Sequence, residues 1–221
     1  MNVPLTKKRI VALISGSGSN LQALIDSCEA GAIHGSIEHV ISNRANAFGL
    51  ERASNHGIST TTLEHGNFPD RQAFDHALLD TIEALKPDLV VLAGFMRILT
   101  SEFVQALHGK MINIHPSLLP KYQGLHTHQR AIDAKDSIHG VSVHYVTPEL
   151  DGGPVIAQSQ CPILSNDTAE SLAARVLTLE HELYPQVVQW FCDDKLSLHA
   201  DGTVTLAEQP LPPSGHILTR V

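Results

Sequence analysis

Two polar residues, Asn113 and His115, lie two positions apart in the run Asn113-Ile114-His115. Alternate residues of a strand project from the same face, so we expect the carboxamide and the imidazole side by side at a strand end. Such a pair can stabilise the negative oxygen that develops in acyl transfer, and the imidazole can also move protons. Pro116 ends the strand, at the carboxyl edge where parallel sheets bind ligands. The alternative is a buried histidine whose ring bonds a backbone carbonyl.

A carboxylate, Asp151, stands in the glycine-rich turn that runs from Glu149 to Pro154. The backbone of such a turn can aim the side chain of Asp151. Paired with an imidazole, the carboxylate would favour the imidazolium and raise the pKa of that histidine. The alternative is a plain β-turn, for which Asp-Gly is a common sequence.

A glycine-rich loop, Ser15 to Asn20 with the sequence SGSGSN, lies between a predicted strand and a predicted helix. Its glycines let the backbone approach a ligand closely, and the following helix presents free N–H groups and a positive dipole end. This pattern indicates a phosphate site. It is not the dinucleotide fingerprint, because the third glycine is missing, and it contains no G-x-S-x-G nucleophile motif. The alternative is a strand-to-helix turn capped by serine or asparagine.

A second candidate for ligand binding is the segment Gly94–Leu99, which follows the most apolar predicted strand. An apolar wall that carries one arginine, Arg97, suits a flat, partly hydrophobic ligand with polar ring edges. The alternative is core packing with an arginine that reaches solvent. His126 and His128 raise the question of a metal, but no cysteine or acidic residue stands nearby at a usual ligand spacing. We therefore expect no functional metal.

Net charge and cysteine content limit the classes of partner. The chain of 221 residues has a net charge of −8 with histidine neutral, which disfavours nucleic-acid binding. Three widely spaced cysteines without a C-x-x-C pair are typical of a reduced, cytoplasmic protein. No segment approaches the roughly 20 apolar residues of a membrane span. We therefore expect a cytoplasmic protein that acts on small molecules, with neither a nucleic-acid nor a membrane partner.

The elements that must position these residues alternate, in the first half of the chain, between short β-branched runs and helical patterns. That alternation is the signature of βαβ units on a parallel sheet. The expected strands are 10–14, 38–42, a marginal 59–63 and 89–93, and the expected helices are 20–30, 47–56 and 69–85.

The second half of the chain changes character. Its expected elements are strands at 111–114, 141–146 and 155–162, the last two antiparallel, a loop at 116–124 and a long helix at 169–190. Pro185 should kink or split that helix. Residues 196–206 are expected to form a hairpin with a type I′ turn at Asp201-Gly202, followed by a proline-rich loop from Pro210.

Together these elements predict an α/β fold in a single domain, 1–221. We expect a Rossmann-like open sheet that is parallel in its N-terminal half, with antiparallel strands and a long helix in its C-terminal half. The core is expected to span about 9–199, and 200–221 to form a hairpin and a proline-rich tail without an assigned role.

Four motifs occur together in the order and spacing of one family: the glycine-rich loop, the Gly94–Leu99 segment, the run NIHPSLLP from Asn113 and the turn ELDGGP from Glu149. Over about residues 9–199 the sequence resembles the folate-dependent phosphoribosylglycinamide formyltransferases. Each motif alone is weak, whereas the set is specific. Ser17 stands where the family often has asparagine and Gln123 where it often has proline, which bears only on the rigidity of those loops.

The resemblance implies a co-substrate, an acceptor and the roles of individual residues. The formyl group of 10-formyltetrahydrofolate would pass to the amine of glycinamide ribonucleotide without a metal. The implied residues are, as catalytic, Asn113, His115 and Asp151; as ribonucleotide-binding, Gly18, Ser19, Asn20, Leu177, Thr178, Leu179 and Glu180; and as folate-binding, Arg71, Met96, Arg97, Ile98, Leu99, Thr147, Pro148, Glu149, Leu150 and Asp151.

In the implied mechanism the amine attacks the formyl carbon, and Asn113 and a protonated His115 stabilise the oxyanion. Asp151 would keep His115 charged and help the proton reach the leaving folate nitrogen. The alternatives are a formyltetrahydrofolate hydrolase, a methionyl-tRNA formyltransferase, a non-catalytic nucleotide- or folate-binding module, and a metal-dependent hydrolase built on His115, His126 and His128. We expect a monomer or a weak homodimer.

Overall fold

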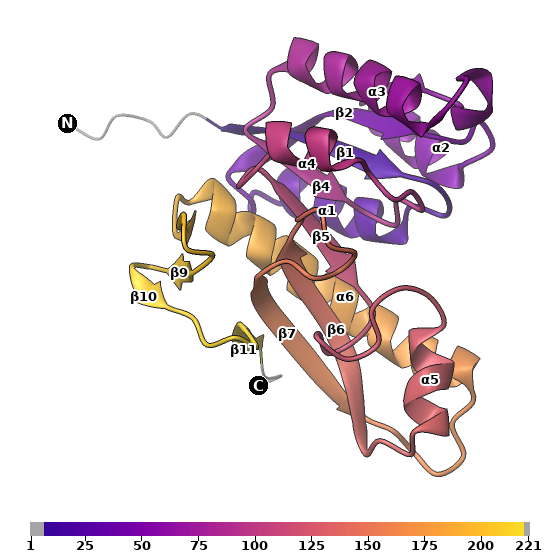
Figure 1. Ribbon diagram of the computed structural model, residues 1–221, viewed down its shortest axis with the longest axis vertical. Coiled ribbons are helices and arrows are strands. Elements are labelled where there is room, and N and C mark those ends of the chain that lie inside the picture. The colour runs from indigo at the N-terminus through magenta and orange to yellow at the C-terminus, as the bar shows by residue number, and fades with distance from the viewer. Residues whose placement is uncertain (1–6, 219–221) are drawn as a thin grey trace.

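The computed structural model describes residues 7–218, and an eight-stranded sheet organises most of them (Figure 1). The order across this sheet is β11-β7-β6-β5-β4-β1-β2-β3, and β8, β9 and β10 form a separate small sheet. The strands are β1 (Lys8–Ile14), β2 (Gly35–Ser42), β3 (Ser59–Thr62), β4 (Leu89–Leu92), β5 (Met111–His115), β6 (Ile138–Tyr145), β7 (Val155–Pro162), β8 (Leu196–Leu198), β9 (Val204–Leu206), β10 (Gln209–Pro210) and β11 (His216–Leu218).

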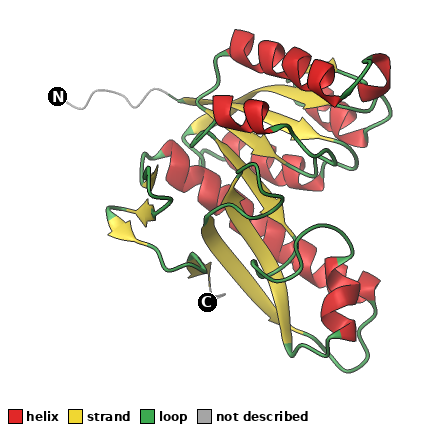
Figure 2. Cartoon of the chain, viewed as in Figure 1, coloured by secondary structure: helices red, strands yellow, loops and turns green. Residues whose placement is uncertain are grey.

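The helices alternate with the strands in the first half of the chain, and the longest follows β7 (Figure 2). They are α1 (Ser19–Glu29), α2 (Phe48–Asn55), the 3-10 helix η1 (His65–Asn67), α3 (Arg71–Leu85), α4 (Ser101–Ala106), α5 (Thr127–Asp133) and α6 (Ala169–Cys192). The short helices α4 and α5 were not predicted from the sequence.

The large sheet changes strand direction beyond β5. The pairs β1–β2, β1–β4, β2–β3 and β4–β5 are parallel, whereas β5–β6 and β6–β7 are antiparallel. This confirms the expected α/β class, with a parallel N-terminal half and an antiparallel C-terminal half. From β1 the chain runs to β2 and β3 on one side and then returns to β4 on the other, so the topological switch point lies between β1 and β4.

Hydrophobic packing covers both faces of β1, the strand at the switch point. Ile10, Ala12 and Ile14 belong to the core that contains residues of α1 and α6, whereas Val11 and Leu13 belong to the core that contains residues of α3 and α4. The alternation follows from the two-residue period of a strand. Buried on both faces, β1 holds the loop that follows it in a fixed place.

Helix α6 runs without interruption through Pro185, so the predicted split of this helix is wrong. Proline removes one intrahelical hydrogen bond, but Leu183, Tyr184 and Val187 are fully buried on either side of it. The hydroxyl of Tyr184 also donates to the backbone oxygen of Leu92, at 2.9 Å. Tertiary packing on both sides of Pro185 therefore supports a helix that continues through it.

The C-terminal segment differs from its prediction in two ways. Strands β8 and β9 pair as expected, but Gly202 (φ 85°) has positive φ and Asp201 does not, so the type I′ turn predicted there is wrong. Ala207 and Glu208, with φ of 47° and 65°, instead form the two-residue turn between β9 and β10. The predicted loop also contains β11, which pairs in parallel with β7. Residues 219–221 of the predicted tail lie outside the described residues.

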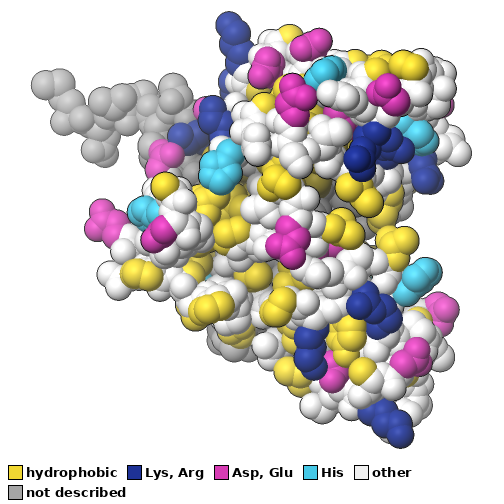
Figure 3. All heavy atoms as spheres, in the orientation of Figure 1, with side chains coloured by type: hydrophobic (Ala, Val, Ile, Leu, Met, Phe, Trp, Pro, Cys, Tyr) yellow, Lys and Arg dark blue, Asp and Glu magenta, His cyan; other side chains and the backbone are white. Residues whose placement is uncertain are grey.

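The surface carries charges of both signs on the face seen in Figure 3, interspersed with polar and apolar side chains. Within residues 7–218, no helix is long and apolar enough to cross a membrane. None of the three cysteines forms a disulfide within the same range.

Candidate active site

The predicted trio of Asn113, His115 and Asp151 comes together beside the carboxyl end of β5. Nδ1 of His115 lies 3.4 Å from Oδ2 of Asp151, and Nδ2 of Asn113 donates to Oδ1 of Asp151 at 3.4 Å. The side chains of His115 and Asp151 are 7% and 10% exposed. The structure therefore joins two residues of one strand to a carboxylate 36 to 38 positions farther along the chain.

Backbone geometry aims the carboxylate of Asp151 into this group. Asp151 has a φ of 48°, a left-handed conformation that aspartate tolerates better than most residues. The backbone N–H of Gly124 donates to Oδ2 of Asp151 at 2.9 Å. The predicted turn around 151–153 connects β6 to β7, so the antiparallel pairing of these strands returns Asp151 to the end of β5.

A fourth side chain, His144 on β6, completes the cluster and was missed by the sequence reasoning. Strand pairing places His144 opposite Asn113, and Nε2 of His144 lies 3.1 Å from Nδ2 of Asn113 and 3.7 Å from Oδ1 of Asp151. Nδ1 of His144 lies 2.9 Å from the backbone oxygen of Tyr145 and must donate to it. Because an amide nitrogen can only donate, Nε2 of His144 accepts from Asn113, and this contact sets the orientation of the carboxamide. The period of the strand alone gives no register and so could not find this contact.

The pKa of His115 departs from its prediction. Burial lowers the pKa of the imidazole below its ordinary value, and the carbonyl of Tyr122 and the carboxylate of Asp151 offset this only in part. The predicted net rise is therefore wrong, although the contribution of Asp151 has the predicted sign. Burial alone would raise the pKa of Asp151, but its contacts with His144, His115 and Gly124 bring it below the usual range.

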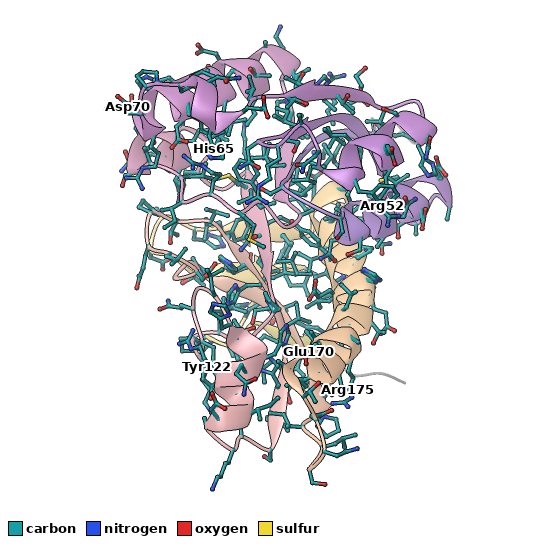
Figure 4. The ribbon with its side chains drawn as sticks, turned by 90° about the vertical axis from the view of Figure 1, so that its right-hand side faces the viewer. Arg52, His65, Asp70, Tyr122, Glu170 and Arg175 are labelled. Carbon is teal, nitrogen blue, oxygen red and sulfur yellow. The ribbon has the colours of Figure 1, made fainter. Side chains whose placement is uncertain are left out.

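The loop after β5 covers the second ring nitrogen of His115. Nε2 of His115 donates to the backbone oxygen of Tyr122 at 2.9 Å. The hydroxyl of Tyr122 donates to Asp136 at 2.7 Å, and the guanidinium of Arg130 lies over the Tyr122 ring, which sits beside α5 (Figure 4). A ligand oxygen could replace this carbonyl as the acceptor, because the donor already points toward it.

The glycine-rich loop meets the first turn of α2 at very close range. Gly18 has a φ of 69°, and a Cβ at this position would lie 2.6 Å from Cα of Gly49. Nε of Arg52 donates to the backbone oxygen of Ser17 at 2.9 Å and fixes the loop from outside (Figure 4). Gly18 is the N-cap of α1, so the N–H groups of Ser19 and Asn20 open the helix next to it. A phosphate is the kind of group that such a helix N-terminus binds.

Of the four predicted ribonucleotide contacts on α6, one joins the glycine-rich loop directly. Nδ2 of Asn20 donates to Oε2 of Glu180 at 2.6 Å, and burial raises the pKa of Glu180 although Asn20 acts in the opposite direction. Leu179 packs in the hydrophobic core, Leu177 is half-buried and Thr178 is exposed. Helical spacing thus turns Leu179 away from solvent while Glu180 points toward α1.

The Gly94–Leu99 segment presents an apolar surface at the switch point. Met96 and Ile98 are 61% and 57% exposed, whereas Leu99 packs against the second core. The guanidinium of Arg97 lies 5.2 Å from the centre of the Phe74 ring. Arg97 is therefore held against α3, which is close to the core-packing alternative.

The other predicted folate contacts lie on two further elements, the helix α3 and the turn that carries Asp151. Arg71 is exposed one turn before Phe74 on α3, on the same face of that helix. Pro148, Glu149 and Leu150 are exposed, and Thr147 is half-buried, on the turn that carries Asp151.

A cavity of about 590 Å³ reaches Asp151 from the side of the C-terminal segment. Gln123 and Glu149 line it together with Thr203 and Leu211. Residues 201–204 and 211–213, in the tail to which the sequence assigned no role, therefore line one side of this cavity.

Within residues 7–218 no group of three or more histidine, cysteine or acidic side chains is arranged to hold a metal ion. Of the metal candidates, His126 is the N-cap of α5, and Nδ1 of His128 lies 3.2 Å from Nε2 of His139.

Comparisons of sequence and of fold with known proteins agree on one family. The formyl transferase family matches residues 8–188. The chain is 53% identical over 207 residues to the phosphoribosylglycinamide formyltransferase of Escherichia coli K12, covering 94% of this chain and 97% of that protein. It is 46% identical to the Haemophilus influenzae enzyme of the same name, covering 95% and 98%. The structure of the phosphoribosylglycinamide formyltransferase from Coxiella burnetii superposes with a TM-score of 0.93 at 50% identity, covering 96% of this chain and 100% of that one. The chain therefore belongs to the formyl transferase family.

Proposed function

We propose that this enzyme transfers the formyl group of 10-formyltetrahydrofolate to the amine of glycinamide ribonucleotide, a step of purine biosynthesis. The observation that carries the proposal is the cluster of Asn113, His115 and Asp151, which shares the carboxyl edge of the sheet with a glycine-rich loop suited to phosphate and an apolar surface suited to a folate ring. The relatives named above are phosphoribosylglycinamide formyltransferases, which favours this acceptor.

In this reaction a bond forms between the amine nitrogen and the formyl carbon, and the bond from that carbon to the folate nitrogen breaks. Negative charge develops on the formyl oxygen in between. Asn113 and His115 supply N–H donors to that oxygen, which His115 can do once the substrate oxygen takes the place of the Tyr122 carbonyl. His144 supports this role by holding one N–H of the Asn113 carboxamide, which leaves for the formyl oxygen the N–H that now donates to Asp151 at 3.4 Å.

The amine loses a proton in this reaction and the leaving folate nitrogen gains one. Asp151, whose pKa lies below its usual range, is a carboxylate at neutral pH and can accept or relay that proton. Burial lowers the pKa of His115 and so disfavours positive charge on its ring before the reaction begins. During the reaction the ring can hold a proton at Nδ1, 3.4 Å from Asp151.

Binding of the ribonucleotide is assigned to Gly18, Ser19 and Asn20 at the start of α1, and to Glu180 with its neighbours on α6. The buried bond between Asn20 and Glu180 supports this assignment, because it links the phosphate end of the loop to the helix that would contact the sugar. Folate binding is assigned to the Gly94–Leu99 segment and to the turn that carries Asp151. The exposed apolar side chains of Met96, Ile98 and Leu150 support that part.

We further propose that the enzyme acts without a metal, on small molecules alone, in the cytoplasm, and as a monomer or a weak homodimer. The absence of a nucleophilic serine or cysteine motif favours direct attack by the amine. The acidic net charge supports small-molecule substrates.

The function is tested by a spectroscopic assay in which the protein is given 10-formyltetrahydrofolate and a chelator, with or without glycinamide ribonucleotide. The assay measures the release of tetrahydrofolate. Release that depends on the ribonucleotide is the expected result. Release without the ribonucleotide would indicate a hydrolase instead. If folate is released under neither condition, the protein is a binding module and the proposal is wrong.

A further inference from the structure

The hydroxyl of Ser15 connects the loops that follow three neighbouring strands. Ser15 comes directly after β1, and its Oγ donates to Oδ1 of Asn43, just beyond β2, at 2.6 Å. The same Oγ accepts from the backbone N–H of Met96, beyond β4, at 2.7 Å. Ser15 and Asn43 are 3% and 2% exposed. Since β1 lies between β2 and β4, this hydroxyl spans the carboxyl edge on both sides of β1.

The two loops that meet at Ser15 are the two candidate binding regions. Ser15 is the first residue of the glycine-rich loop, and Met96 lies in the Gly94–Leu99 segment. The backbone N–H of Ser15 also donates to the oxygen of Gly94, at 3.1 Å. The hydroxyl therefore crosses the topological switch point, where open α/β sheets bind their ligands.

Asn43 directs this hydroxyl. A serine hydroxyl has one proton to donate and lone pairs with which to accept, so a proton aimed at Oδ1 of Asn43 leaves a lone pair for the N–H of Met96. Nδ2 of Asn43 is buried and has no hydrogen-bond partner within the described part of the chain. Burying an unpaired amide donor is unfavourable. Asparagine at this position is therefore explained by its oxygen, which orients Ser15.

We propose that Ser15 and Asn43 are positioning residues that hold the Gly94–Leu99 segment against the glycine-rich loop, so that the two substrates meet at reacting distance. This inference rests on the proposed function, because that function places folate on one side of Ser15 and the ribonucleotide on the other. Neither side chain is expected to touch a reacting atom.

The test is Ser15→Ala, measured by steady-state kinetics and by binding of each ligand alone. Loss of the hydroxyl should displace the Gly94–Leu99 segment. We then expect kcat to fall at least about tenfold, since small misplacements of bound reactants have large effects on rate. The Kd of tetrahydrofolate should rise about fivefold, whereas the Kd of glycinamide ribonucleotide should stay within about twofold of the wild-type value.

Asn43→Ala should show the same pattern with a smaller loss of kcat, and it provides the test if Ser15→Ala does not fold. The double variant should be no worse than Ser15→Ala, because the two residues act as a unit.

Ser159→Ala is the matched control. Ser159 on β7 has the same 3% exposure as Ser15, and its hydroxyl donates to the backbone oxygen of Leu218 at 3.3 Å, on the strand pair β7–β11. This variant should keep kcat and both Kd values, and its Tm should fall about as much as that of Ser15→Ala.

The inference is overturned if Ser15→Ala keeps kcat and the Kd of tetrahydrofolate within twofold of the wild type. It is also overturned if both ligands lose affinity equally, which would indicate a general structural defect. Failure of the proposed function is distinguishable, because folate release by the wild-type protein would then not depend on the ribonucleotide. Even then, the Kd of tetrahydrofolate for the wild type and the variants would show whether Ser15 holds the Gly94–Leu99 segment in place.

Discussion

The two halves of the site are assembled in different ways. The glycine-rich loop is one contiguous stretch, and its shape is set by Gly18, Gly49 and the start of α1. The cluster beside β5 instead draws its side chains from β5, β6 and the turn before β7, and depends on antiparallel register. A local motif needs only the right strand-to-helix turn, whereas the cluster needs two strands paired without a slip, since a slip of one residue would turn His144 to the other face.

The largest effect is expected when one member of the cluster is removed. His115→Ala and Asp151→Asn should each lower kcat at least about 100-fold, because each removes a group that acts only as charge develops. The KM values of both substrates should stay near wild type, since the glycine-rich loop is untouched. Steady-state kinetics would check this, with Asp26→Asn on the exposed side of α1 as control. Near-normal turnover in either variant would contradict the catalytic assignment.

The complementary change is Gly18→Val in the glycine-rich loop. A side chain here would meet the backbone of Gly49 and would be strained at a φ of 69°. The KM of the ribonucleotide should rise roughly tenfold or more, equivalent to about 1.4 kcal/mol of binding free energy, with a much smaller rise for folate. Gly31→Val is the control, because Gly31 has a φ of 73° but nothing within 4 Å of its Cβ position. Equal effects on both substrates would argue against phosphate binding at this loop.

A smaller effect is expected from His144, which acts through Asn113. His144→Leu should lower kcat about fivefold, in keeping with the roughly 1 kcal/mol that one hydrogen bond contributes. His144→Gln offers an oxygen acceptor to Nδ2 of Asn113 and should recover part of that loss. The comparison of kcat between these two variants, with unchanged KM showing intact substrate binding, tests whether His144 orients the carboxamide of Asn113. Equal kcat in both variants would exclude that role.

The smallest effect concerns Glu180, which joins α6 to the glycine-rich loop. Burial raises the pKa of this carboxyl above its value in the unfolded chain, so stability is lost as the pH rises through that raised pKa. Glu180→Gln can still accept from Asn20 and should raise Tm at pH 8 by about 2–4 °C, corresponding to about 1 kcal/mol. The difference should shrink as the pH falls toward 4.5, which thermal melts over a pH series would show. A lower Tm at pH 8 would mean that the charge stabilises the fold.

Local patterns predicted much of this protein, because they act over a few residues. The strand that ends at Ile14, the strand that carries Asn113, the turn with Asp151 and the mixed sheet could all be predicted from the sequence. The motif order also led to the family, since four short runs in fixed spacing are specific together. Roles of the individual residues remain predictions until the variants above are measured.

Other features depended on contacts between segments far apart in the chain. Helix α6 continues through Pro185 because the core holds both of its sides, and β11 forms because β7 offers it a free edge. His144 faces Asn113 only through the register of β5 and β6.

Residue types alone specify which groups are available: an amide, an imidazole and a carboxylate, with glycines before a helix. Folding then sets the burial, the pKa and the partners of these groups. It buried His115 so that its pKa falls in spite of Asp151, covered its Nε2 with the carbonyl of Tyr122, and tied Ser15 to Met96 across the switch point. The physical reason is that burial and register arise from the packing of the whole chain, and residue type alone encodes neither.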